Sequence, residues 1–379
     1  MKIEFSLYLD IIRLFASLLV VLYHSANIYD PGGFLFTLGH EAVVIFFVLS
    51  GYVIAYISDT KEKKLKDYAA SRLARIYSVA LPAILLTMLV DQLGFSINLA
   101  AYPEGYQAWD HAWIRTLGSL FFLNEFWLIS IQSFSNVPYW SLNYEVWYYV
   151  VFALVTYVEG PKRWALLAIT LLILGPKILM LLPIWWLGVY IYRAQWIRLI
   201  SKSTAALLLT CSILALSLFI VFDLSQQGWD LLKGALGADR HELLAFSRHT
   251  LSDYLLATLV ATHFVAINIL APDLLGGLKR FQRPIRYFSS FTFAGYLFHQ
   301  PLLLFFKALF LEGSADLQTY LLILGSTLIT IWLLGRYTES QQPVLKKALK
   351  RLLYSQAWDR LFRLQSPAKE LSTSDERHR

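Results

Sequence analysis

Ten apolar runs recur along this chain of 379 residues, and most of them are long enough to cross a membrane. A transmembrane helix needs roughly 17–25 apolar residues. Hydrophobic residues make up 57% of the chain and charged residues only 16%, which is more apolar surface than one soluble core can hide. The sequence therefore predicts an all-α, polytopic transmembrane bundle of about ten helices, over residues 8–28, 40–57, 78–94, 141–158, 164–174, 178–192, 204–222, 251–270, 288–311 and 319–337.

Two apolar stretches do not fit a simple span. The run 164–174 is short alone, and we expect it to form a kinked pair with 178–192 across Gly175-Pro176, so that the count of spans is nine or ten. The stretch 113–130 is interrupted by charged and polar side chains. Because such side chains are costly against lipid, this stretch is predicted to be re-entrant or interfacial.

The distribution of Lys and Arg predicts the orientation. The two termini and the connections that would share their side of the membrane hold 25 of the 33 Lys and Arg residues, and the connections on the other side hold five. Because basic loops stay in the cytoplasm, both termini are predicted to be cytoplasmic, and the chain is expected to be a multi-pass protein of the cell inner (cytoplasmic) membrane. The net charge of +7 is then a topology signal, and no nucleic-acid partner is expected.

The chain is predicted to divide into a transmembrane domain, residues 1–340, and a cytoplasmic tail, residues 341–379, with no soluble domain attached. From Pro343 to Leu364 the tail mixes Lys and Arg with Leu at helical spacing. That spacing is typical of an amphipathic helix lying on anionic membrane lipids. The last residues, 372–379, are predicted to be disordered.

The first apolar run contains two ionisable residues, Arg13 and His24. Ionisable side chains inside a span are costly and mark function more often than elsewhere. Eleven positions of a helix come within about 20° of three full turns, so the two residues share one face, roughly 16 Å apart along the axis. Arg13 is predicted near the cytoplasmic end and His24 near the outer end. The alternative is that Arg13 reaches lipid phosphates and His24 only sits at the outer interface.

A pair of arginines, Arg72 and Arg75, enters the third span from the predicted cytoplasmic side. Residues three positions apart lie on the same side of a helix. Two guanidinium groups at a membrane mouth suit a phosphate ligand, because each can bind two oxygens at once. The alternative is that both are ordinary basic residues of a cytoplasmic connection.

Glu145 lies about a turn inside the fourth span, where a carboxylate needs a partner or a proton. His24 is at comparable depth on the same side, so we expect the two to meet as a general base and its orienting carboxylate. The alternative is an interfacial glutamate bonded to tyrosines. His299 lies in the middle of another span, and both a catalytic role and that of a hydrogen-bonded core histidine stay open.

In this order the motifs resemble the integral-membrane acyltransferase family 3, from Phe5 to about Pro343. The motifs are Leu9-Asp10-Ile11-Ile12-Arg13 followed by His24, Phe46-Phe47-Val48-Leu49-Ser50-Gly51-Tyr52, the Arg72/Arg75 pair, Trp140-Ser141-Leu142 followed by Glu145, and Tyr296-Leu297-Phe298-His299-Gln300-Pro301. The chain departs from the family pattern where Ser78 replaces a usual proline, and where His40-Glu41-Ala42-Val43 replaces a glycine-rich approach. These departures bear on the subfamily and the acceptor.

The resemblance implies transfer of an acyl group, usually acetyl, from cytoplasmic acyl-CoA to a hydroxyl of a carbohydrate or lipid-linked glycan, such as an exopolysaccharide or O-antigen unit. It implies donor-binding roles for Arg13, Arg72 and Arg75, and catalytic roles for His24 and Glu145. No metal is expected, because His, Asp and Glu do not cluster at ligand spacing and the single cysteine excludes a multi-cysteine site.

The mechanism expected from these residues starts with acyl-CoA docking from the cytoplasm, its phosphates on the arginines. His24, oriented by Glu145, then removes the proton of the acceptor hydroxyl. Direct transfer and a covalent acyl-histidine relay both fit the residues. A competing hypothesis is a transporter or flippase in which Arg13, His24 and Glu145 form a substrate or proton path. A further one is an accessory subunit of glycan export that binds lipid-linked sugar without chemistry.

Overall fold

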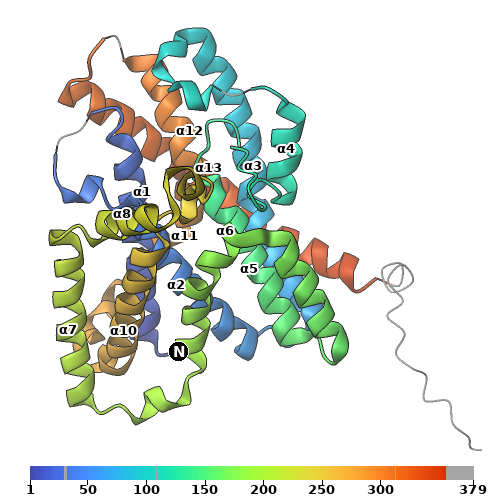
Figure 1. Ribbon diagram of the computed structural model, residues 1–379, viewed down its shortest axis with the longest axis vertical. Coiled ribbons are helices and arrows are strands. Elements are labelled where there is room, and N and C mark those ends of the chain that lie inside the picture. The colour runs from blue at the N-terminus through green and yellow to red at the C-terminus, as the bar shows by residue number, and fades with distance from the viewer. Residues whose placement is uncertain (30–31, 108, 312, 356–379) are drawn as a thin grey trace, which may run out of the picture.

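The computed structural model describes residues 1–29, 32–107, 109–311 and 313–355. Throughout these ranges the regular structure is helical, and the only strand-like pairing is an isolated bridge between Ser133 and Asn136. The all-α fold class is therefore confirmed (Figure 1).

Eight helices in the described ranges are long and apolar enough to cross a membrane, and the chain is a multi-pass membrane protein. They are α1 (Ile3–Ser25), α2 (Gly39–Thr60), α3 (Leu65–Asn98), α6 (Pro161–Arg193), α7 (Lys202–Val221), α10 (Thr250–Leu274), α12 (Thr292–Phe310) and α13 (Leu317–Leu353). The predicted span 141–158 forms α5 (Tyr139–Tyr157), which is long enough but too rich in polar and aromatic residues to join this set.

The ten apolar runs become nine labelled elements among the described residues, because 164–174 and 178–192 both lie in α6, where two helices meet at a kink. The predicted kink is confirmed: Gly175 is non-helical, with φ 74° and ψ 178°. Pro176 has no N–H to offer the carbonyl of Leu172 one turn earlier. The indole of Trp127 takes that place, and its Nε1 donates to the Leu172 carbonyl over 2.8 Å.

The stretch 113–130 contains one short helix, α4 (Ala112–Phe121), which at ten residues is too short to span a membrane. The loop after it is tied to α6 by a buried ion pair, in which Lys177 Nζ lies 3.0 Å from a Glu125 oxygen. Lys177 also donates to the carbonyl of Ile129. A re-entrant or interfacial position for this stretch stays a prediction.

Helices α2 and α6 approach each other closely, because two glycines face the opposite backbone. A Cβ atom on Gly51 would lie 2.0 Å from the carbonyl oxygen of Trp185, and one on Gly188 would lie 2.0 Å from that of Val48. Small residues permit this kind of contact between membrane helices. The approach fixes Ser50, whose hydroxyl accepts a hydrogen bond from the Trp185 indole over 3.1 Å.

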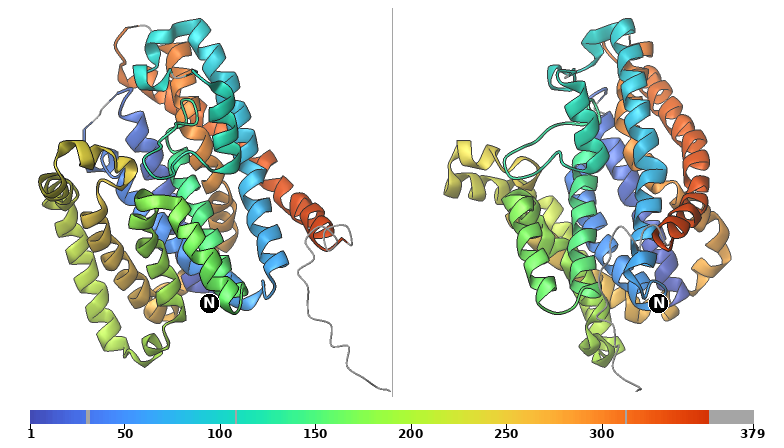
Figure 2. Two further views of the ribbon diagram at one scale, coloured as in Figure 1. Left: turned by 45° about the vertical axis from the view of Figure 1, so that its right-hand side comes forward. Right: turned by 90° about the vertical axis from the view of Figure 1, so that its right-hand side faces the viewer.

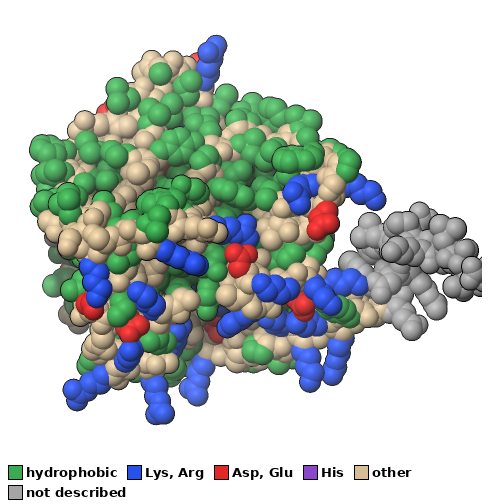
Figure 3. All heavy atoms as spheres, turned by 90° about the horizontal axis from the view of Figure 1, so that it is seen from below, with side chains coloured by type: hydrophobic (Ala, Val, Ile, Leu, Met, Phe, Trp, Pro, Cys, Tyr) green, Lys and Arg blue, Asp and Glu red, His purple; other side chains and the backbone are tan. Residues whose placement is uncertain are grey.

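The connections between helices separate to two ends of the bundle. Both views of Figure 2 place the N-terminus with the α2–α3 and α5–α6 connections at one end, and α4 with the start of α13 at the other. Viewed from below, Lys and Arg side chains gather beside a broad apolar surface (Figure 3). The connections that the sequence assigns to one side do share an end. Which side that end faces stays a prediction.

The predicted boundary between domain and tail falls inside α13, which passes residue 340 without a break. Near its end, Lys350 forms an ion pair of 2.5 Å with Asp67 of α3, and Tyr354 donates to the same carboxylate. The division at residue 340 and the binding of this segment to lipid stay predictions. The predicted disordered residues, 372–379, lie outside the described residues.

Candidate functional site

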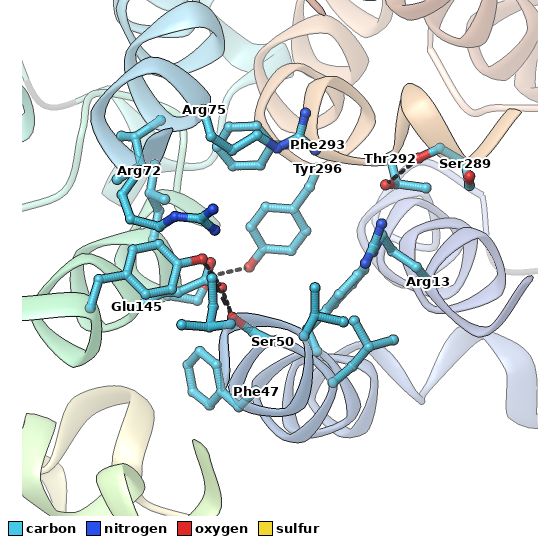
Figure 4. Close-up of a pocket in the computed structure, with 18 of the residues that line it drawn as sticks. Arg13, Phe47, Ser50, Arg72, Arg75, Glu145, Ser289, Thr292, Phe293 and Tyr296 are labelled. Carbon is cyan, nitrogen blue, oxygen red and sulfur yellow. Dashed lines mark hydrogen bonds between the residues drawn. The ribbon is translucent and has the colours of Figure 1, made fainter. Parts of the chain in front are cut away.

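A cavity of about 430 Å³ lies between α1, α2, α3, α5, α12 and the short helix α11 (Gln282–Ser290). We call it the arginine cavity, because four of the residues that line it are Arg13, Arg72, Arg75 and Arg286. Arg13 and Arg72 approach it from opposite sides (Figure 4). The three arginines that the sequence selects therefore meet in one place, although they come from different helices.

Each arginine of the cavity is paired with a carboxylate. Arg72 donates to both oxygens of Glu62, at 3.1 and 3.3 Å. Arg75 pairs with Glu339 of α13. Asp10 forms ion pairs with the other two arginines, Arg13 at 3.5 Å and Arg286 at 2.7 Å.

The side chains of the four arginines are exposed to different degrees. The exposed fractions are 44% for Arg286, 28% for Arg75, 25% for Arg13 and 13% for Arg72. Sequence reasoning missed Arg286, because it lies in a connection with three other basic residues that the orientation rule already explained. Only the packing of α11 against α1 brings it to the cavity.

Glu145 also lines the arginine cavity, but its partners are not the predicted ones. It accepts hydrogen bonds from the hydroxyls of Ser50 and Tyr149, the latter over 2.6 Å. The expected pairing of Glu145 with His24 is wrong, because the structure gives His24 other partners. Similar depth along two helices did not bring the two side chains to the same place.

Tyr296 of α12 closes the arginine cavity on the side of His24 and His299. Its hydroxyl lies 2.5 Å from that of Ser141 and donates to the carbonyl of Pro138 over 3.2 Å. Its ring packs edge-on against Phe46, with 5.8 Å between centroids, and lies 6.1 Å from the ring of His299. Tyr296 therefore faces the cavity on one side and His299 on the other.

His24 and His299 form a histidine pair beyond Tyr296. His24 Nδ1 lies 3.2 Å from His299 Nε2, and the ring centroids are 5.0 Å apart. His24 does not line the arginine cavity, whereas Arg13 on the same helix does. Between them, Ser17 donates to the carbonyl of Thr292, so the face of α1 that carries both residues is the one that borders α12.

The chemistry of the arginine cavity fits a phosphate-bearing ligand. Guanidinium groups bind phosphate oxygens two at a time, and four of them converge here. Phe46, Phe47 and Leu49 also line the cavity with apolar surface. This surface suits a less polar part of such a ligand. Among the residues that the structure describes, no group of three or more His, Cys, Asp or Glu side chains is placed to hold a metal ion.

Comparison with known proteins adds a family and one distant relative. The family model described as "Acyltransferase domain", acyltransferase 3, matches residues 6–336. The exopolysaccharide production protein ExoZ of Rhizobium meliloti (strain 1021) is 30% identical over 153 residues, which cover 38% of this chain and 42% of that relative. The chain thus matches about two fifths of the length of this relative. No solved structure matches the chain.

Proposed function

Because the chain belongs to the acyltransferase 3 family, whose model matches residues 6–336, we propose that it is a membrane O-acetyltransferase that uses acetyl-CoA as donor and a carbohydrate hydroxyl as acceptor. The observation that carries this proposal is the arginine cavity, where four guanidinium groups converge within a membrane bundle. Such a concentration of phosphate-binding groups is expensive among apolar helices even with carboxylate partners, and it suits an anionic ligand.

The proposed orientation places both termini and the mouth of the arginine cavity in the cytoplasm, with the protein in the cell inner membrane. The excess of Lys and Arg at that end supports this orientation. Acyl-CoA is a cytoplasmic metabolite, so the donor would enter from the side where Arg286 is most exposed. The histidine pair would then lie toward the outer face, where a glycan acceptor arrives.

In the proposed complex, Arg13, Arg72 and Arg75 bind the phosphates of the donor, and Arg286 assists at the mouth. The acyl-bearing arm extends past Tyr296 toward His24. Glu145 acts from within the cavity, where its carboxylate, held by Ser50 and Tyr149, accepts hydrogen bonds from the amide groups of that arm. This role replaces the expected orientation of His24 by Glu145.

The proposed base is His24, which removes the proton of the acceptor hydroxyl as the oxygen attacks the thioester carbonyl. A positioned general base contributes roughly 10²–10⁴-fold to a rate. Both direct transfer and a covalent acyl-histidine relay would use the same imidazole nitrogen. A rapid denaturing quench at neutral pH during turnover separates them, because only the relay leaves labelled acyl groups on the protein and an acyl-imidazole hydrolyses quickly in acid.

The proposed acceptor is a cell-surface carbohydrate, such as a unit of an exopolysaccharide or O-antigen, free or lipid-linked. The printed name of the relative in Rhizobium meliloti, an exopolysaccharide production protein, supports this class. A transporter or flippase would use the same polar groups as a path. Cleavage of the CoA thioester by purified protein distinguishes the two, because a simple transporter leaves the thioester intact.

The test is acyl transfer from labelled acetyl-CoA to surface glycan in inverted membrane vesicles, comparing wild type with His24→Ala and Arg72→Ala. We expect transfer to be lost in both variants at normal protein levels. Arg193→Ala is the matched control, because Arg193 forms an ion pair with Asp59 outside the cavity. Full activity of His24→Ala would reject the proposed base, and no thioester cleavage by the wild type would favour the transporter.

A further inference from the structure

We propose that His299 is a positioning residue for His24: its Nε2 accepts a hydrogen bond from the Nδ1–H of His24 and so leaves His24 Nε2 as the basic nitrogen. This inference rests on the proposed function and assigns to His299 the orienting role that the sequence assigned to Glu145. His299 is completely buried in the middle of α12. Its Nε2 lies 3.2 Å from His24 Nδ1.

The backbone of α12 sets the tautomer of His299. Its Nδ1 lies 2.8 Å from the carbonyl oxygen of Tyr296 and 3.1 Å from that of Gly295. Carbonyl oxygens only accept hydrogen bonds, so Nδ1 must carry the proton. A neutral imidazole has one N–H, and His299 Nε2 is therefore left with a lone pair that can only accept.

The tautomer of His24 follows from the same reasoning. Its Nδ1 lies 2.9 Å from the carbonyl oxygen of Val20 and 3.2 Å from His299 Nε2. Both neighbours are acceptors, so Nδ1 of His24 carries the proton and shares it between them. Nε2 of His24 is then unprotonated, which is the state that a general base needs.

The chemical step balances on this arrangement. The acceptor oxygen forms a new bond to the acyl carbon while its proton moves to His24 Nε2. The bond from the acyl carbon to sulfur then breaks, and His24 returns the proton to the leaving thiolate. While His24 is an imidazolium, its Nδ1–H keeps donating to His299, which stabilises the charge where few polar groups surround it.

A half-buried histidine on another helix shows what a purely structural arrangement looks like. His263 of α10 has Tyr8 Oη 2.7 Å from its Nε2 and Ser212 Oγ 3.1 Å from its Nδ1. Both ring nitrogens are engaged with hydroxyls, so the single lone pair of the neutral ring is not left free for chemistry. His299 differs because its second nitrogen is directed at another imidazole, whose own second nitrogen stays available.

The experiment compares His299→Asn with His299→Gln in the full-length protein, with acetyl-CoA as donor. The Asn amide reaches about as far as Nδ1, so it can still donate to the carbonyl of Tyr296 but withdraws the acceptor from His24. The Gln amide reaches the place of Nε2 and restores an acceptor oxygen. We expect kcat to fall about 100-fold in His299→Asn, within the range for losing a positioned base, and to recover to within about 10-fold of wild type in His299→Gln.

The KM for acetyl-CoA separates positioning from damage to the fold. His299 does not line the arginine cavity, so KM is expected to stay within about twofold in both variants, whereas a distorted bundle would raise it. A double variant gives a second readout. If His299 acts through His24, adding His299→Asn to His24→Ala costs nothing further, because residues that act as a unit are non-additive.

The possible outcomes distinguish failure of the positioning role of His299 from failure of the proposed function. His299→Asn with wild-type kcat, or His299→Gln as impaired as His299→Asn with a raised KM, would overturn the positioning role and leave the proposed function standing. Wild-type kcat in His24→Ala would overturn the proposed base and the positioning role together. His263→Asn serves as the control for a hydrogen-bonded histidine on another helix and is expected to keep wild-type kcat.

Discussion

The arginine cavity and the histidine pair are built on opposite principles, although α1 and α12 run through both. In the cavity every arginine has a carboxylate partner and keeps part of its side chain exposed. The histidine pair has neutral neighbours, and His299 is completely buried. A permanent charge in an apolar environment needs a partner, whereas a neutral imidazole needs only hydrogen bonds.

This difference supports the proposed division of labour, with donor binding in one region and proton transfer in the other. Groups that stay charged suit recognition of an anionic donor, and a neutral imidazole with one unprotonated nitrogen suits proton transfer. Variants of the cavity should therefore change donor affinity, and variants of the histidine pair should change turnover. The following predictions test that separation.

The largest effect is expected for His24→Ala. Removing the base should lower kcat roughly 10²–10⁴-fold, with the Kd for CoA unchanged because His24 does not line the arginine cavity. Steady-state transfer assays and isothermal titration calorimetry on detergent-purified protein measure the two quantities. A parallel loss of CoA affinity would break the separation between the two regions.

Arg72→Ala should weaken CoA binding roughly 10–100-fold, because hydrogen bonds to charged groups contribute about 1.5–3 kcal/mol each. Arg72 is the most enclosed arginine of the cavity, so its interactions are the least screened. Arg72→Lys should recover only part of the affinity, since an ammonium cannot bind two oxygens in the same plane. An unchanged Kd in Arg72→Ala would mean that the phosphates lie elsewhere.

Arg286→Ala should weaken CoA binding by about tenfold at most, because this side chain is the most exposed of the four and exposed charges are screened. The effect should shrink as the salt concentration rises, more than for Arg72→Ala. Titrations at low and high ionic strength check both statements. Arg280→Ala is the control, since Arg280 lies in the same basic connection but does not line the cavity.

Glu145→Gln gives the smallest effect and tests the corrected pairing most directly. Loss of the charge but not of the shape should raise KM for acetyl-CoA about 3–10-fold, the range for one neutral hydrogen bond, and leave kcat within about twofold. A fall in kcat as large as that of His24→Ala would instead restore the glutamate as the partner of the base.

The sequence predicts which segments form helices and how far along each helix its polar groups lie. Apolar runs predicted the spans, and the Gly175-Pro176 pair predicted the kink in α6, because both signals are local. The arginines Arg72 and Arg75 were placed at one mouth for the same reason. Their spacing along a single helix determines that they face the same way.

What the sequence could not supply is the direction in which each helix faces its neighbours. His24 and Glu145 were paired because they share a depth, yet depth says nothing of rotation about the helix axis. The close approach of α2 to α6 places Ser50 beside Glu145, and the contact of α1 with α12 places His299 beside His24. Both depend on packing between segments far apart in the chain.

The carboxylates beside the arginines affect how quickly the proposed donor would leave the cavity. Asp10, Glu62 and Glu339 form ion pairs with the guanidinium groups of the cavity. In the proposed complex, an incoming phosphate competes with them for the guanidinium N–H groups, which limits affinity, and they regain these groups as the spent carrier departs. The cavity thus contains its own competitors, and such internal competition favours a donor site that exchanges its occupant quickly rather than one that retains it.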